Sequence, residues 1–183
     1  MSSYLPVGAD GHTIRWSTWD HEWVEEVSIS WENEAWTVSG AVGRERVQYV
    51  FRLSPTWQVR QFLLFRDLDE PDLWLASDGG GRWGEVNGAH RTDLDGCYDL
   101  DLPCTPFTRS IPVHRLPLHV GHTAEITVAR IDVDTLEVSP EPHRYTRLAS
   151  HRWQLTRDAE PPTEFDVDEH GLVVDEPQRF RRL

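Results

Sequence analysis

The sequence predicts a mainly β protein: a strongly curled antiparallel sheet with a barrel-like body and little helix. Hydrophobic and polar residues alternate along most of the chain, which is typical of strands with one buried face. Short turn sequences rich in glycine, asparagine and proline separate these runs. No stretch has the pattern of an amphipathic helix of three or more turns. Roughly a dozen strands in one domain must curl or close to protect their edges.

Composition limits the organisation and the partners of the protein. The 183 residues predict one domain spanning 1–183, long enough to bury a core. Acidic residues outnumber basic ones by 31 to 18, and every basic residue other than histidine is arginine. A net charge of −13 argues against nucleic acid or an anionic membrane as the main partner. Because neither a signal peptide nor an apolar run of ~20 residues occurs, we expect a cytoplasmic protein without stable membrane insertion; the oligomeric state stays open.

The N-terminal half reads as antiparallel strands joined by short turns. Period-two patterns run over residues 14–16, 27–31, 36–42 and 47–53. The continuous apolar run Phe62–Phe65 predicts a strand covered on both faces. Residues 79–84 match the pattern Gly-x-Gly-x-x-Gly, but the turn sequence that follows them excludes the helix that a dinucleotide-binding motif requires. We interpret these glycines as the tip of a hairpin.

The C-terminal part continues the strand pattern. Within residues 123–133 the apolar positions change from even to odd numbers, which predicts a β-bulge or a strong bend. Further strands are predicted around 136–138, 145–148, 153–155 and 165–167, with a loop at 159–162. Nine tryptophans are spread over the chain, a residue that suits both β cores and the walls of apolar or sugar-binding cavities.

The central segment 96–118 differs from the rest of the chain. It holds both cysteines, which we expect to be free thiols, and four prolines, of which Pro103, Pro106 and Pro112 should stop the strand and prevent a helix. On an extended strand alternate residues share a face. Three residues are therefore predicted to face the core: Tyr98, Leu100 and Leu102. The three that alternate with them, Cys97, Asp99 and Asp101, are predicted to face solvent or an interior cavity.

Three motifs of this segment carry a family resemblance: Gly-Cys-x-Asp-x-Asp-Leu at 96–102, Pro-x-Thr at 106–108, and the run 111–116. With them the chain resembles a bacterial family of glycolipid-binding proteins. The likeness extends to Trp83, to 145–147, to 167–168 and to 171–173. Two positions depart from the pattern, Arg109 in place of an asparagine and His114 in place of an arginine. The resemblance implies a curled β body similar to bacterial lipoprotein carriers that binds an amphipathic glycolipid, and it brings no catalytic residue.

We therefore expect non-enzymatic binding of an apolar or amphipathic ligand, such as a glycolipid, in the concave interior. No cofactor, metal site or nucleic-acid partner is predicted, because the histidines form no metal-binding motif. Asp99 and Asp101 leave three readings open: pairing with arginines such as Arg115, ligand binding, or catalysis in an enzyme acting on a sugar or lipid head group. The candidate residues for the cavity are Trp57, Trp83, Cys97, Asp99, Asp101, Thr108, Arg115 and Tyr145.

Overall fold

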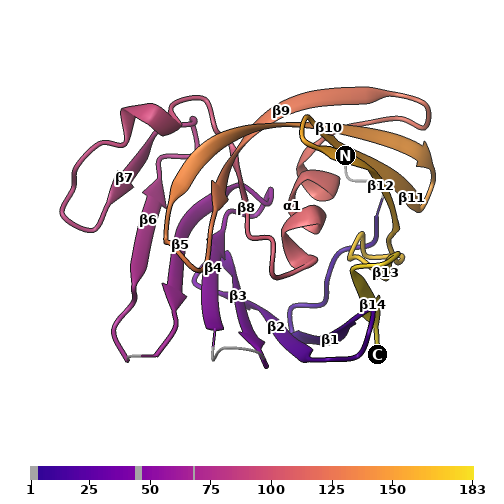
Figure 1. The fold of residues 1–183 in the computed structure, drawn as a ribbon, viewed down its shortest axis with the longest axis horizontal. Helices are drawn as coiled ribbons and strands as arrows, with labels where there is room; N and C mark the ends of the chain where they lie inside the picture. The colour runs from indigo at the N-terminus through magenta and orange to yellow at the C-terminus, as the bar shows by residue number, and fades with distance from the viewer. Residues whose placement is uncertain (1–3, 44–46, 68) are drawn as a thin grey trace.

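Two β-sheets face each other with one α-helix between them (Figure 1). The computed structural model describes residues 4–43, 47–67 and 69–183. The larger sheet has nine strands in the order β13-β14-β1-β2-β3-β4-β5-β6-β7, all antiparallel. Its strands are β1 (His12–Thr18), β2 (Val24–Glu32), β3 (Ala35–Val42), β4 (Val47–Leu53), β5 (Val59–Phe65), β6 (Leu73–Ser77), β7 (Trp83–Glu85), β13 (Asp175–Glu176) and β14 (Phe180–Arg182).

The smaller sheet has five strands in the order β12-β11-β10-β9-β8. Its edge strand β8 runs parallel to β9, and the other pairs are antiparallel. A short 3-10 helix, η1, precedes β8, and helix α1 follows it. The bounds are η1 (Thr92–Leu94), β8 (Asp99–Asp101), α1 (Phe107–Arg115), β9 (Thr123–Ile131), β10 (Val138–Ala149), β11 (Arg152–Arg157) and β12 (Glu160–Asp166).

The alternating residues of the sheets build the core as predicted. In β4 the odd-numbered residues from Val47 to Leu53 are buried, while Gln48 on the other face is exposed. The apolar run of β5 is covered less completely than expected. Phe62 and Leu64 are fully buried, whereas Leu63 and Phe65 stay partly exposed. The glycine-rich stretch forms a hairpin, with Ser77 of β6 opposite Trp83 of β7.

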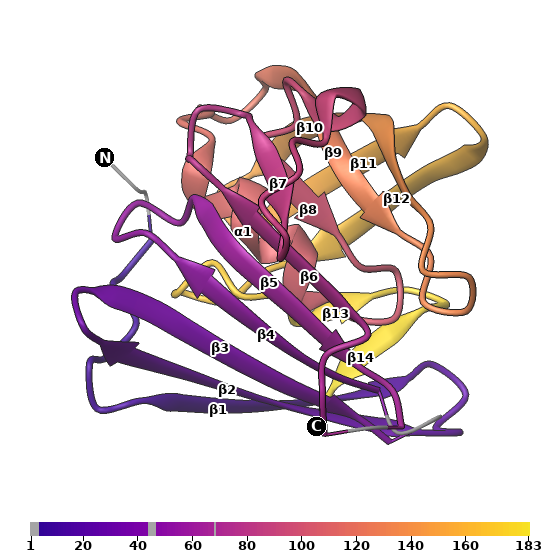
Figure 2. The same ribbon diagram turned by 90° about the vertical axis from the view of Figure 1, so that its left-hand side faces the viewer.

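The prediction of a strongly curled, barrel-like body is not confirmed. Both sheets remain open, since β13 and β7 bound the larger one and β12 and β8 the smaller one. Figure 2 shows the strands β1 to β6 lying side by side as an open layer. Two packed layers bury the core without closure, and short edge strands limit the exposed backbone.

The expectation that the prolines prevent a helix is wrong. Helix α1 contains Pro112 and begins directly after Pro106, where a missing N–H costs nothing. Pro112 removes one internal hydrogen bond, yet its own carbonyl accepts the amide of Leu116 at 2.8 Å. Every residue from Phe107 to Val113 is buried between the sheets. Tertiary burial therefore outweighs the local propensity.

Three smaller predictions are also corrected. Of the two alternatives predicted for residues 123–133, a β-bulge or a strong bend, the bulge is wrong within 123–131, because the register of β9 against β10 is continuous. The change of parity instead reflects burial on both faces, because Val128 and Ala129 are both buried. Residues 160–162 belong to β12 and not to a loop. Tyr98, expected in the core, is about half exposed.

Candidate functional site

A bidentate ion pair ties the end of α1 to β8. Asp99 is fully buried, and both of its carboxylate oxygens accept hydrogen bonds from Arg115, with Nε 2.9 Å from Oδ1 and Nη2 2.5 Å from Oδ2. Buried carboxylates require such partners. This geometry supports the first of the three interpretations of Asp99, namely that it pairs with an arginine and stabilises the fold.

Asp101 makes a second contact between β8 and α1. Its Oδ1 accepts the Thr108 hydroxyl at 3.0 Å and Arg109 Nη1 at 2.9 Å. Burial would raise the pKa of Asp101, but the nearby cations Arg109, His143 and Arg157 outweigh burial and lower it. Asp101 is therefore a buried carboxylate whose charge is compensated.

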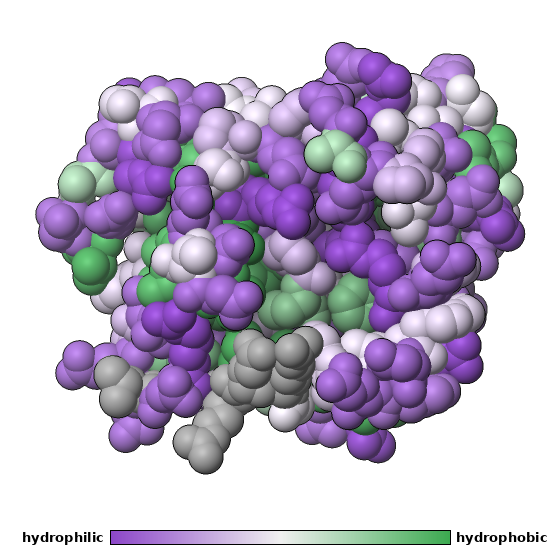
Figure 3. Space-filling view, in the orientation of Figure 1, coloured by the Kyte–Doolittle hydropathy of each residue, from purple (hydrophilic) through white to green (hydrophobic). Residues whose placement is uncertain are grey.

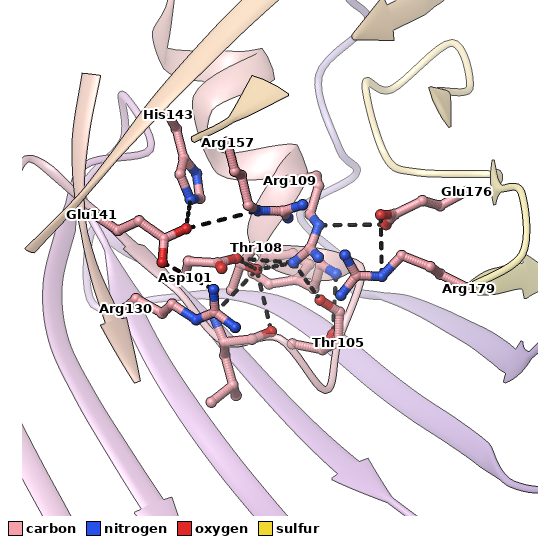
Figure 4. Close-up of polar contacts among 12 residues, drawn as sticks. Asp101, Thr105, Thr108, Arg109, Arg130, Glu141, His143, Arg157, Glu176 and Arg179 are labelled. Carbon is pink, nitrogen blue, oxygen red and sulfur yellow. Dashed lines mark hydrogen bonds and ion pairs between the residues drawn. The ribbon is translucent and has the colours of Figure 1, made fainter. Parts of the chain in front are cut away.

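The contacts of Asp101 belong to a larger network of ion pairs that runs from the buried Arg109 to partly exposed residues (Figure 4). From Arg109 the network continues to Glu176 at 3.4 Å, and from Glu176 to Arg179 at 3.4 Å. Glu160 then lies within 4 Å of three arginines, which links β12 to β9 and β11. The full set alternates carboxylates and guanidinium groups: Asp101, Arg109, Glu176, Arg179, Glu160, Arg157, Glu141 and Arg130.

Three other predicted cavity residues are core residues. Trp83 donates its indole N–H to the carbonyl of Cys97 at 2.7 Å, which fixes the β6–β7 hairpin on the segment before β8. Burial, together with Asp93, raises the pKa of Cys97 to about 11, so its thiol stays protonated. Tyr145 is buried, and burial raises its pKa. None of the three lines an opening described here.

The space between the sheets, where a ligand was expected, is filled. Helix α1 occupies it, and Phe107 packs near Phe51, with 5.8 Å between ring centroids. The larger openings lie at the ends of the sandwich instead. The alternative of an enzyme requires Asp99 and Asp101 to face a solvent-reachable pocket, whereas both are buried against arginines and line neither opening.

One of these openings is an aromatic cleft of about 440 Å³. The N-terminal segment forms one wall, the turn between β4 and β5 forms another, and the C-terminal end of α1 forms the third. The residues of this aromatic cleft include Tyr4, Leu5, Trp36, Trp57, Val113, His114, Arg115, Leu116 and Arg147.

Stacked rings form the base of the aromatic cleft. His114 lies parallel to Trp57 at 3.7 Å between ring centroids, and the ring centroid of Trp36 lies 6.3 Å from that of Trp57. Burial lowers the pKa of His114 to about 4, so this imidazole is neutral at physiological pH. The base of the cleft is therefore aromatic and uncharged.

Two arginines give the aromatic cleft a basic edge. Arg115 uses Nε and Nη2 for Asp99, and its Nη1 makes no hydrogen bond to any described residue. Arg147 donates to the carbonyls of Leu118 and Ser150 and lies over the Tyr4 ring at 5.2 Å. Among the described residues that line the cleft, none is acidic. An acidic protein thus keeps one opening free of carboxylates.

The structure brings together only part of the predicted site. Trp57 and Arg115 line the aromatic cleft, while Asp99, Asp101 and Thr108 hold the helix beneath it. The sequence reasoning missed other lining residues, since their contacts join distant parts of the chain: Tyr4, Trp36, His114 and Arg147. Of these residues, only His114 was marked by the sequence, as a departure from the family pattern, and it lies at the base of the aromatic cleft.

Two further observations concern metals and membranes. Among residues 4–43, 47–67 and 69–183, no three histidine, cysteine or acidic side chains are grouped so as to hold a metal ion. The described part of the chain also contains no helix with the length and hydrophobicity needed to span a membrane.

Comparisons with known proteins agree with the fold. A family model described as "Putative glycolipid-binding" matches residues 13–182. A crystal structure of a DUF1089 family protein from Pseudomonas aeruginosa is similar, with 28% sequence identity and a TM-score of 0.74 over 91% of this chain and 92% of that chain. No curated protein matches the sequence.

Proposed function

We propose, because the chain belongs to the family described as putative glycolipid-binding, that it binds an amphipathic glycolipid in the aromatic cleft without converting it chemically. One observation carries this proposal: an opening of about 440 Å³ combines an aromatic, uncharged base with a basic edge. Its volume lies within the roughly 300–1,000 Å³ of small-molecule sites. Because the space between the two sheets is filled, we place the ligand in the cleft at the end of the sandwich.

The two kinds of surface suit the two parts of such a ligand. Leu5 and Leu116 extend the apolar surface from the ring stack to the mouth of the cleft, where Leu5 is more than half exposed. This surface would hold an acyl segment or the apolar face of a sugar ring. The remaining N–H donor of Arg115, at Nη1, would donate a hydrogen bond to an oxygen of the head group. Binding would therefore need no rearrangement of the buried ion pairs.

A titration monitored by tryptophan fluorescence tests the proposal, with native mass spectrometry of gently purified protein to detect a bound lipid. The double variant Leu5→Ser/Leu116→Ser removes apolar surface from the mouth of the cleft and should weaken binding of a short-chain glycolipid by about tenfold or more. Val86→Ser, an exposed apolar residue of the β6–β7 region, is the matched control. Equal affinity of the double variant and the control would rule out the cleft as the site.

A further inference from the structure

A second opening lies at the opposite end of the sandwich from the aromatic cleft. It has about 420 Å³ and lies beside the start of β2 and the end of β3, whereas the aromatic cleft lies beside the other ends of these strands. Figure 3 shows this face, with a hollow whose floor is hydrophobic and whose upper rim is hydrophilic. We call it the arginine pocket; its main residues are Trp23, Val42, Val47, Arg130, Arg179 and Phe180.

The floor of the arginine pocket is apolar. Val42, Val47 and Phe180 reach it from the larger sheet, and Ile131 reaches it from the end of β9. All four side chains belong to the buried apolar set of the protein. A hydrocarbon segment placed on them would leave water without displacing a polar contact.

The wall of the arginine pocket carries two guanidinium groups with unused donors. Arg179 lies 3.4 Å from Glu176 and 3.6 Å from Glu160, but its side chain makes no hydrogen bond to any described residue. Arg130 uses Nη1 for both of its carboxylate partners, which leaves Nε and Nη2 without a hydrogen bond to the described chain. Both side chains are about one-third exposed and can therefore meet a ligand.

The buried neighbour of Arg179 is also incompletely paired. Arg109 is fully buried, and its Nε and Nη2 have no hydrogen-bond partner in the described chain. Arg109 and Arg179 converge on the same carboxylate, Glu176 (Figure 4). Burial and the nearby Arg109 lower the pKa of Arg179. Both oxygens of Glu176 likewise make no hydrogen bond within the described chain, so ion pairs alone hold this group together, and Arg179 keeps hydrogen-bond donors for a ligand in the pocket that it lines.

Two acidic residues also line the arginine pocket, Asp132 and Asp134, and neither forms a hydrogen bond to these two guanidinium groups. Asp132 turns toward its own loop, where Oδ1 accepts the amides of Asp134 and Thr135 at 2.9 and 2.8 Å. Asp134 is exposed at the rim. No ion pair within 4 Å joins either carboxylate to a described arginine. The carboxylates that pair with the two arginines, Glu141, Glu160 and Glu176, do not line the pocket, so the only acidic residues in its described lining are those at the loop and the rim.

We propose that the arginine pocket binds a single-chain anionic amphiphile, with its carboxylate on Arg179 and Arg130 and its hydrocarbon chain on the apolar floor. Hydrogen bonds between guanidinium and carboxylate groups are among the strongest in proteins. This site is separate from the aromatic cleft, and the inference does not depend on the function proposed for the cleft.

Three probes with the same chain length test the head group: decanoate, decanol and decylamine, each titrated against the full chain by calorimetry. Decanoate should bind about tenfold or more tightly than decanol, because only the carboxylate forms charge-assisted hydrogen bonds. Arg179→Gln should remove this preference. Arg152→Gln, which changes an exposed arginine paired with Glu164, is the matched control and should keep the preference.

Several results would overturn the inference. Equal binding of decanoate and decanol, tighter binding of decylamine, or unchanged decanoate binding by Arg179→Gln would each exclude recognition of the anion by this wall. Loss of decanoate binding in Leu5→Ser/Leu116→Ser would place the ligand in the aromatic cleft instead. Arg130→Gln provides a second variant if Arg179→Gln fails to fold, and it should also reduce the preference for decanoate.

Discussion

The imidazole of His114 lies flat on the indole of Trp57, with centroids 3.7 Å apart and planes 3° from parallel. Trp57 reaches this position with a backbone φ of +64°, in the left-handed region that residues other than glycine rarely adopt. The turn holds it there: the amide of Trp57 donates to the Ser54 carbonyl at 2.9 Å, and the Ser54 hydroxyl accepts the amide of Gln58 at 3.1 Å. The stack thus joins the β4–β5 turn to the end of α1.

Acid should weaken the fold through His114. Burial lowers the folded-state pKa to about 4 from 6.5, so between these values the unfolded chain binds a proton that the folded chain excludes. Stability from this group is present above about pH 6.5 and is lost as pH falls to 4. The loss amounts to at most about 3 kcal/mol.

Urea denaturation at pH 7.5 and 4.5 measures this loss, and His114→Phe should reduce it while keeping a ring on Trp57. His119→Phe changes an exposed histidine and serves as the control. If wild type and His114→Phe lose equal stability over this interval, His114 is not the group responsible.

Glu25 should act in the opposite direction. Burial raises its folded-state pKa from 4.5 to about 7, although its carboxylate accepts the Tyr49 hydroxyl at 2.5 Å. A raised pKa means that the folded chain holds the proton longer. The stability is therefore fully present below about pH 4.5 and is lost as pH rises through 7.

The substitution Glu25→Gln should accordingly stabilise the protein at pH 8 by on the order of 2–3 kcal/mol relative to its effect at pH 5. Thermal or urea unfolding at the two values gives this difference. Glu26→Gln, on the exposed face of the same strand, should show no such dependence on pH. A Glu25→Gln effect that is the same at both values would contradict the raised pKa.

Trp57 should reverse the usual order of alanine and glycine variants. Removing this large buried ring costs about 3–5 kcal/mol in either variant. At ordinary positions glycine is less stable than alanine by roughly 0.5–1 kcal/mol. With φ at +64°, alanine retains the backbone strain and glycine releases it, so Trp57→Gly should be at least as stable as Trp57→Ala.

Trp36 provides the matched comparison, because it is a similarly buried tryptophan in a regular strand. There Trp36→Ala should be more stable than Trp36→Gly. Measuring the free energies of unfolding of the four variants shows whether the order of alanine and glycine differs between positions 57 and 36. The same order at both positions would show that the backbone of Trp57 is unstrained.

The strands were predictable from the sequence because each alternates over its own residues. Residues 47–53 fix which face of β4 is buried without reference to any other element. The openness of the sheets was not predictable, because it depends on how two layers pack. Helix α1 was missed for a related reason: its prolines oppose a helix locally, while its burial comes from contacts with both sheets.

The candidate site divides in the same way. The pairing of Asp99 with Arg115 could be predicted from the sequence, since both residues lie in one segment and a buried carboxylate needs a cation. The aromatic cleft was not, because Tyr4, Trp36 and His114 come from three separate parts of the chain. Arg109 shows the limit most clearly. It was noted only as a departure from the family pattern, yet it is the fully buried cation that pairs with both Asp101 and Glu176.

Asp99→Asn tests whether the ion pair between Asp99 of β8 and Arg115 of α1 is structural. The carboxylate is fully buried, so an amide would leave the Arg115 guanidinium without its counter-ion. Removing one partner of a buried pair typically costs 3–5 kcal/mol, and the partial exposure of Arg115 reduces this to about 2–4 kcal/mol. Urea denaturation should show this loss, whereas Asp93→Asn, which changes an exposed carboxylate paired with Arg91, should cause little.

The double variant Asp99→Asn/Arg115→Met separates the pair from its neighbours. If the two residues act mainly on each other, the double variant should lose less stability than the sum of the single variants, because no unpaired charge remains. Additive losses would show that Arg115 and Asp99 stabilise the fold independently. An Asp99→Asn protein as stable as wild type would reopen a direct role of this carboxylate in ligand binding.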